Sequence, residues 1–104
     1  MWVSINEAQR RILSEFLGKD LPLEVSYNEL MPIVEKINSL DKSIQFAIFK
    51  TYVSCTSERG GKFYKDFNFS HAEYVIEGQT LVEAILKLIL RFVIWHRDQK
   101  LVAV

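Results

Sequence analysis

The sequence predicts an α+β fold in which helices and an antiparallel β-sheet pack in layers. Two stretches before residue 41 and one long stretch after residue 80 repeat apolar residues at helical spacing, and the middle of the chain alternates with period two. Hydrophobic residues make up 49% of the 104 residues and charged residues 25%, which is typical of a globular domain and excludes a disordered chain. We therefore expect one domain over residues 1–104.

The first expected helix runs from about Ile5 to Leu17. Its apolar residues fall on one half of a helical wheel, and its polar residues, Ser14 among them, fall on the other half. Ser4 and Glu7 have the spacing of a capping box, and Gly18 stands where a glycine commonly ends a helix. The capping residues, the apolar face and the glycine at the end therefore all predict the same helix.

A second helix is expected from about Asn28 to Leu40, after a loop over residues 19–25. Its apolar residues form a single stripe: Leu30, Ile33, Val34, Ile37 and Leu40. Pro32 fits without cost only in the first turn, where its missing N–H would have had no partner. We expect either a start near residue 28 or 29, or a kink if Ser26 caps the helix.

The alternation from Ser43 to about Ser57 predicts a β-strand. One face would carry Ile44, Phe46, Ile48 and Tyr52, and the other Ala47, Phe49, Thr51 and Val53. Because both faces are largely apolar, we expect both to be covered and the sheet to lie between helices.

The turn signal Glu58-Arg59-Gly60-Gly61 predicts that this strand continues into a β-hairpin. Residues 62–70 would form its second strand, with three phenylalanines on one face. Residues 71–77 offer a short third strand, with Ala72, Tyr74 and Ile76 pointing inward.

The last expected helix runs from about Leu81 to Asp98, and Thr80 and Glu83 have capping-box spacing at its start. The residues that would cover the sheet are Leu81, Ile85, Leu88, Ile89 and Phe92. A second apolar row consists of Leu86, Leu90 and Ile94, beside Glu83, Lys87 and Arg91. Either a helix from the first half covers this row, or the row is a homodimer or partner interface with the charged residues as its rim.

Several runs resemble the phage ABA-sandwich domain family. They are LMPIVEKINSL at residues 30–40, SEFLG at residues 14–18, and the closing AILKLILRFVIWHRDQK at residues 84–100. These small proteins are encoded by bacteriophages and prophages, and their name describes helix–sheet–helix layering. The resemblance implies this layer order and a phage-related origin. It implies no activity or site residues.

No catalytic, cofactor or metal site is expected. Cys55 is interpreted as a small apolar core residue, and His71 and His96 lie on different expected elements. One cysteine and two histidines at no characteristic spacing argue against zinc, and Glu73 and Glu77 near His71 add only a weak oxygen-ligand candidate.

Basic and aromatic residues at the expected hairpin tip suggest a nucleic-acid contact as the runner-up function. They are Arg59, Lys62, Tyr64 and Lys65. The chain has thirteen basic and thirteen acidic residues, so its net charge of zero favours a plain solvated turn instead. We expect nucleic-acid binding to be absent.

The remaining expectations concern location and role. Residues 1–11 carry charges where a signal peptide would be apolar, and residues 81–95 contain three charges, too many for a membrane span. We expect a cytoplasmic, phage- or prophage-related protein that works as a non-enzymatic protein–protein interaction module. Its partner would be a second copy of itself or an unidentified phage or host protein. The nucleic-acid module and an enzyme of unknown type are the alternatives.

Overall fold

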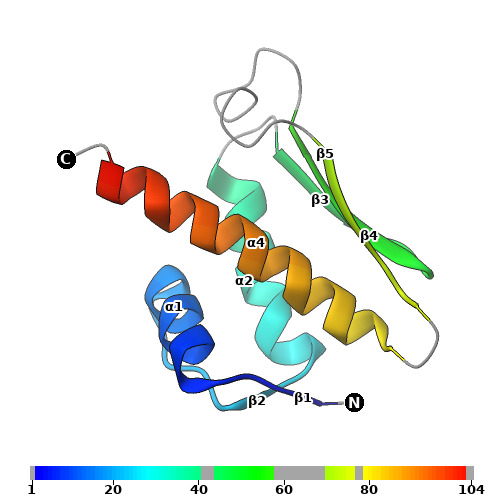
Figure 1. Ribbon diagram of the computed structural model, residues 1–104, viewed down its shortest axis with the longest axis horizontal. Helices are drawn as coiled ribbons and strands as arrows, with labels where there is room; N and C mark the ends of the chain where they lie inside the picture. Colours follow the sequence, from blue (N-terminus) through cyan, green and yellow to red (C-terminus); the bar gives the residue numbers. More distant parts are fainter. Residues whose placement is uncertain (1, 41–43, 58–69, 77–78, 103–104) are drawn as a thin grey trace.

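The computed structural model describes residues 2–40, 44–57, 70–76 and 79–102 (Figure 1). Within these ranges lie the helices α1 (Glu7–Leu17), α2 (Tyr27–Leu40) and α4 (Leu81–Val102). A two-stranded sheet pairs β1 (Val3–Ser4) with β2 (Glu24–Val25). A three-stranded sheet has the order β3-β4-β5, with β3 (Ile44–Ile48), β4 (Tyr52–Ser57) and β5 (Ser70–Tyr74). All of these pairings are antiparallel, and the layered α+β fold expected from the sequence is confirmed.

The capping box of α1 differs from the expected one. Asn6 is the N-cap: its side-chain oxygen accepts from the Gln9 N–H at 2.8 Å, and Gln9 Oε1 accepts from the Asn6 N–H at 3.1 Å. Ser4 cannot cap, because its backbone belongs to β1 and pairs with Glu24. At the other end Gly18 adopts the expected left-handed conformation, with φ 79°.

The segment between α1 and α2 is more ordered than the expected loop. Its last residues form β2, and Leu21 is buried in the core. Ser14 was expected on the polar face of α1 but is only 9% exposed, and its Oγ accepts from the Leu21 N–H at 3.0 Å. This hydrogen bond satisfies a buried donor of the turn that follows the helix.

Ser26 caps α2, which makes Pro32 an interior residue. The Leu30 N–H donates to the Ser26 carbonyl at 3.1 Å, and the Ser26 hydroxyl donates to Glu29 Oε2 at 2.9 Å. Pro32 therefore falls in the second turn and removes one helical hydrogen bond. The expected apolar stripe is confirmed: Leu30, Ile33, Val34 and Ile37 are buried.

The single strand expected over residues 43–57 is wrong, because the chain turns back within it. The Phe49 N–H donates to the Tyr52 carbonyl at 2.8 Å and closes a tight turn between β3 and β4. Residues opposite each other in an antiparallel pair share a face, so Phe46 faces the same way as Cys55, and Ile48 the same way as Val53. The two expected sets are therefore mixed: Ile44, Phe46, Ile48 and Val53 lie on one face, and Ala47, Phe49 and Tyr52 lie on the other.

The third strand is present as β5, with the opposite orientation to the expected one. Val53 pairs with Glu73, so Glu73 points inward, whereas Tyr74 and Ile76 are 65% and 63% exposed. The expected strand over residues 62–70 and the turn at residues 58–61 lie outside the described residues, except for residue 70.

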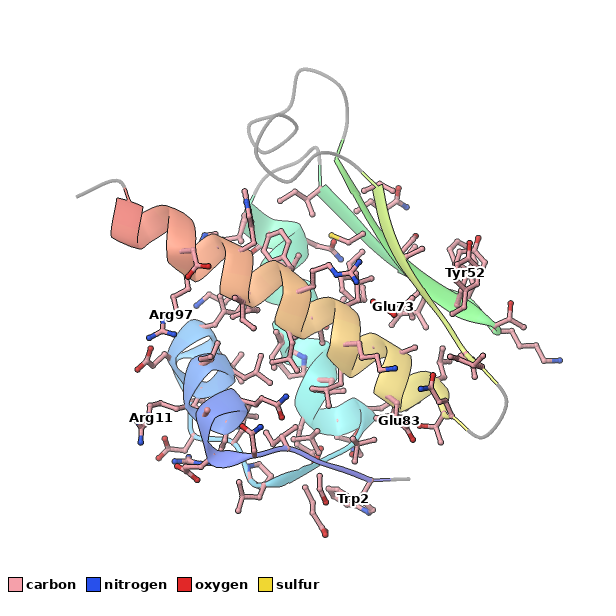
Figure 2. The ribbon with its side chains drawn as sticks, viewed as in Figure 1. Trp2, Arg11, Tyr52, Glu73, Glu83 and Arg97 are labelled. Carbon is pink, nitrogen blue, oxygen red and sulfur yellow. The ribbon has the colours of Figure 1, made fainter. Side chains whose placement is uncertain are left out.

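The helices pack on the buried face of the three-stranded sheet. α2 contacts β3, α4 contacts β4 and β5, and α1 contacts both of these helices. Figure 1 shows α4 crossing in front of α2 beside the sheet. Figure 2 shows Glu73 on the side of the sheet that faces α4 and Tyr52 on the opposite side. The core between sheet and helices includes Phe92, Ile85, Leu88, Ile33 and Val53, each fully buried.

Candidate functional site

The apolar row on α4 is divided between core and surface. Leu86 is 7% exposed and Leu90 is half-buried, so residues of the same chain cover this part of the row. Ile94 is 42% exposed. The row is therefore an open surface only near Ile94.

The charged residues beside this row face solvent to different degrees. Glu83 is half-buried, and its N–H donates to the Thr80 hydroxyl at 3.2 Å, as the capping spacing predicted. Lys87 is exposed, and Arg91 donates to Glu73 on β5 at 2.8 Å. This ion pair links the exposed side of α4 to the inner face of β5.

The four residues of the expected basic hairpin tip lie outside the described residues: Arg59, Lys62, Tyr64 and Lys65.

Cys55 is a core thiol, as expected. It is 1% exposed, and burial raises the pKa of its thiol to about 12. The protonated form therefore persists at neutral pH, where a nucleophilic cysteine would need to be a thiolate. The strand register places residue 71 opposite Cys55, a proximity that the sequence patterns did not predict. His96 lies elsewhere, with its ring 5.7 Å from Phe16 and 6.1 Å from Phe92 between centroids.

Two further findings concern ligands and membranes. Among the residues that the structure describes, no three His, Cys, Asp or Glu side chains gather as metal ligands would. A hollow of about 410 Å³ at the end of α1 has mixed charge: Arg10, Arg11, Ser14, Glu15, Gly18, Lys19 and Asp20 line it. In the same described part of the chain, every helix is too short or too polar to cross a bilayer.

The most distinctive exposed feature is a set of stacked aromatic rings on the outer face of the sheet. Phe49 stacks on Tyr52 with 4.6 Å between ring centroids, and Tyr52 stacks on Tyr74 with 5.5 Å. Phe49 is 45% exposed, and Ile76 beyond the end of β5 is also exposed. We call the three stacked residues, Phe49, Tyr52 and Tyr74, the aromatic cluster.

The backbone explains how this cluster forms. The turn that joins β3 to β4 brings Phe49 and Tyr52 together, and the register of β4 with β5 sets Tyr52 opposite Tyr74. Around it the outer face carries small or uncharged residues: Gln45, Ala47, Ser54, Thr56 and Ala72. Lys50, in the turn, is an exposed charge at its border.

Sequence reasoning missed the cluster because it depends on this turn. In one continuous strand, Phe49 and Tyr52 would point to opposite faces. The turn residues Lys50 and Thr51 are not among those that usually mark hairpin turns. One signal was available in the sequence. Phe49 and Tyr52 are three positions apart, which is the spacing of the two residues that flank a two-residue turn.

Comparisons of the chain with protein-family models, curated proteins and solved structures found no match. The resemblance to the phage ABA-sandwich family therefore rests on the residue runs given above.

Proposed function

We propose that this protein is a non-enzymatic protein–protein interaction module of phage or prophage origin, acting in the cytoplasm, and that the aromatic cluster is its contact surface for a phage or host protein. The observation that carries the proposal is the stack of Phe49, Tyr52 and Tyr74 on the outer face of the sheet, in which Phe49 and Tyr74 are exposed and Tyr52 is half-buried. The phage origin rests on the sequence resemblance alone.

Several properties of the cluster favour a protein partner. Aromatic side chains are enriched at the centres of protein interfaces, where they bury large areas and lose few rotamers. Monomers seldom expose contiguous apolar patches without a use for them. Stacking also holds the rings in place before binding, so less side-chain entropy is lost on association.

The charges around the cluster favour protein over nucleic acid. Affinity for nucleic acid comes largely from contacts between basic side chains and phosphates. Among the described residues at the cluster and on the surrounding outer face, Lys50 is the one basic side chain. A largely uncharged surface with an aromatic centre suits a protein patch of similar polarity.

The first prediction uses a photo-crosslinking residue in place of Tyr74, in cells that carry the phage or prophage. We expect it to capture a discrete partner protein, and we expect Tyr52→Ser in the same chain to reduce capture at least tenfold. Central aromatic contacts are commonly worth 2 kcal/mol or more, and about 1.4 kcal/mol corresponds to tenfold in affinity. Mass spectrometry of the crosslinked product identifies the partner.

The matched control places the same crosslinker at Trp2, which is 60% exposed and belongs to a different part of the surface. Figure 2 shows Trp2 at the lower edge of the molecule, away from Tyr52 on the outer side of the sheet. Identical products from positions 2 and 74, or none from position 74, would contradict the proposal. A product made only of two copies of the chain would show no phage or host partner at the cluster and would also contradict the proposal.

A further inference from the structure

The outer edge of β5 presents backbone groups that the protein itself does not use. The Val75 N–H donates to the Thr51 carbonyl at 2.9 Å, so residues 71, 73 and 75 direct their backbone groups toward β4. Because successive residues of a strand direct their backbone N–H and C=O groups to opposite sides, those of Ala72 and Tyr74 point away from β4. Within the described part of the chain, no hydrogen bond to these outward groups is found. An open strand edge of this kind can pair with another strand.

The opposite edge of the sheet is partly closed. In β3 the Phe46 N–H points away from β4, and it donates to Asn38 Oδ1 of α2 at 2.8 Å. A side chain in this position blocks strand addition at β3. The two edges therefore differ, and β5 is the one available for pairing.

The exposed side of α4 lies next to this open edge. Ile85, Ile89 and Phe92 are fully buried and mark the core side of the helix. Successive residues lie 100° apart around a helix, so Ile94 is on the side of α4 opposite to Ile85. Arg91 lies between these two sides of the helix and forms its ion pair with Glu73 on β5. The open edge and the exposed end of the α4 row therefore share one side of the molecule.

We propose that two copies of this chain form a symmetric dimer through β5. The two β5 strands pair antiparallel about a twofold axis at Ala72, which joins the sheets into one six-stranded sheet, and the two α4 helices pack side by side around Ile94. This proposal goes beyond the proposed function, because it uses the backbone edge of β5 and not the side chains of the aromatic cluster, and it does not need the cluster to bind a partner.

The strand register follows from the residues of β5. An axis at Ala72, the middle residue, pairs the whole of β5 and keeps the two copies of Glu73 out of register with each other. An axis at Glu73 would set two glutamates opposite each other, which is destabilising. An axis at Tyr74 would require the outward carbonyl of Ile76, which already accepts from the Gln79 N–H at 2.9 Å.

The spacing of the helices also fits. α4 contacts both β4 and β5, so we place its axis over the space between these two strands, about half a strand spacing inside the edge. Since neighbouring strands are about 4.8 Å apart, the two α4 axes would be about 10 Å apart, which is the ordinary distance for packed helices. Three hydrogen-bonded residue pairs would each exchange two backbone bonds, so about six new hydrogen bonds would join the strands.

The test is disulfide trapping in a glutathione redox buffer, in which oxidised glutathione accepts the two electrons when two thiols join. Ala72→Cys places the new thiols across the axis, at a Cα separation of about 5.5 Å that a disulfide can bridge. Tyr74→Cys is the matched control, because its two copies would be about 14 Å apart along the strands. We expect covalent dimers of the first variant and none of the second.

Sedimentation equilibrium supplies the second readout. We expect the unmodified chain to show a monomer–dimer equilibrium, and Ile94→Glu to weaken association at least about tenfold, a loss of 1.4 kcal/mol. Ile94 is exposed in the single chain, so this variant should fold with an unchanged circular dichroism spectrum. Trp2→Glu, at an exposed apolar residue elsewhere, should dimerise as the unmodified chain does.

Each outcome bears on the dimer separately from the proposed partner. An unmodified chain that is monomeric at all concentrations overturns the dimer, and so does trapping of Tyr74→Cys in preference to Ala72→Cys. Loss of partner capture with Tyr52→Ser while the dimer persists would support both proposals. Dimerisation without any captured partner would leave the dimer standing and remove the proposed function.

Discussion

Ser14 connects the end of α1 to the segment that follows it. Its hydroxyl oxygen accepts from the buried Leu21 N–H, and its carbonyl accepts from the Gly18 N–H at 2.8 Å. The helical wheel placed Ser14 on the polar side because the wheel considers α1 alone. The returning chain, which buries Leu21, turns this polar position into an interior one.

A prediction at this scale is that Ser14→Ala destabilises the domain by about 1–3 kcal/mol, because it leaves the Leu21 N–H buried without an acceptor. Urea denaturation followed by circular dichroism measures the change. Ser39→Ala is the matched control, since Ser39 is exposed and donates only to the Lys36 carbonyl. Equal losses in the free energy of unfolding of the two variants would show that the hydrogen bond to the Leu21 N–H does not stabilise the domain more than an exposed one.

At the scale of single helices and strands, local sequence patterns predicted some features correctly and missed others. The apolar faces of α2 and α4 and the Gly18 end of α1 were predicted correctly, because each depends on residues within a few turns of one another. The N-cap of α1 was not predicted correctly, because Ser4 belongs to β1 and pairs with Glu24, twenty positions later in the chain. The turn at Lys50 and Thr51 was also missed, because the alternating pattern continues on both sides of it and the turn residues are unremarkable.

The corrected cap makes a prediction about α1. Asn6→Ala should cost about 1 kcal/mol, since it removes the acceptor for the Gln9 N–H, whereas Ser4→Ala should have little effect. Thermal or urea unfolding of the two variants compares them directly. If Ser4→Ala were the more damaging change, the Ser4–Glu7 capping box expected from the sequence would be the correct one.

At the scale of the whole molecule, the fold divides the surface into covered and open sides. α2 and α4 lie on the buried face of the three-stranded sheet and α1 packs against these two helices, whereas Phe49 and Tyr74 on the outer face are exposed. The open edge of β5 joins this outer face to the exposed side of α4. A dimer through β5 would place two aromatic clusters on one continuous face, suited to a partner with two-fold symmetry or with two binding segments.

The predicted interface shows why a candidate site is harder to predict than a fold class. The periodicity of α4 identified Leu86, Leu90 and Ile94 as a row, but the position of α1 beside α4 decides how much of it remains exposed. The aromatic cluster needs contacts between three segments, and its register is set only once the strands pair. Helical periodicity is local, whereas both surfaces are properties of the assembled chain.

Residue-resolved amide hydrogen exchange at several protein concentrations tests the central claim, that β5 is an open edge used for self-association. The amides of Glu73 and Val75 point toward β4 and should be protected at every concentration. Those of Ala72 and Tyr74 should exchange quickly in dilute solution and become protected as the concentration rises. Rapid exchange of Ala72 and Tyr74 at all concentrations would contradict the account.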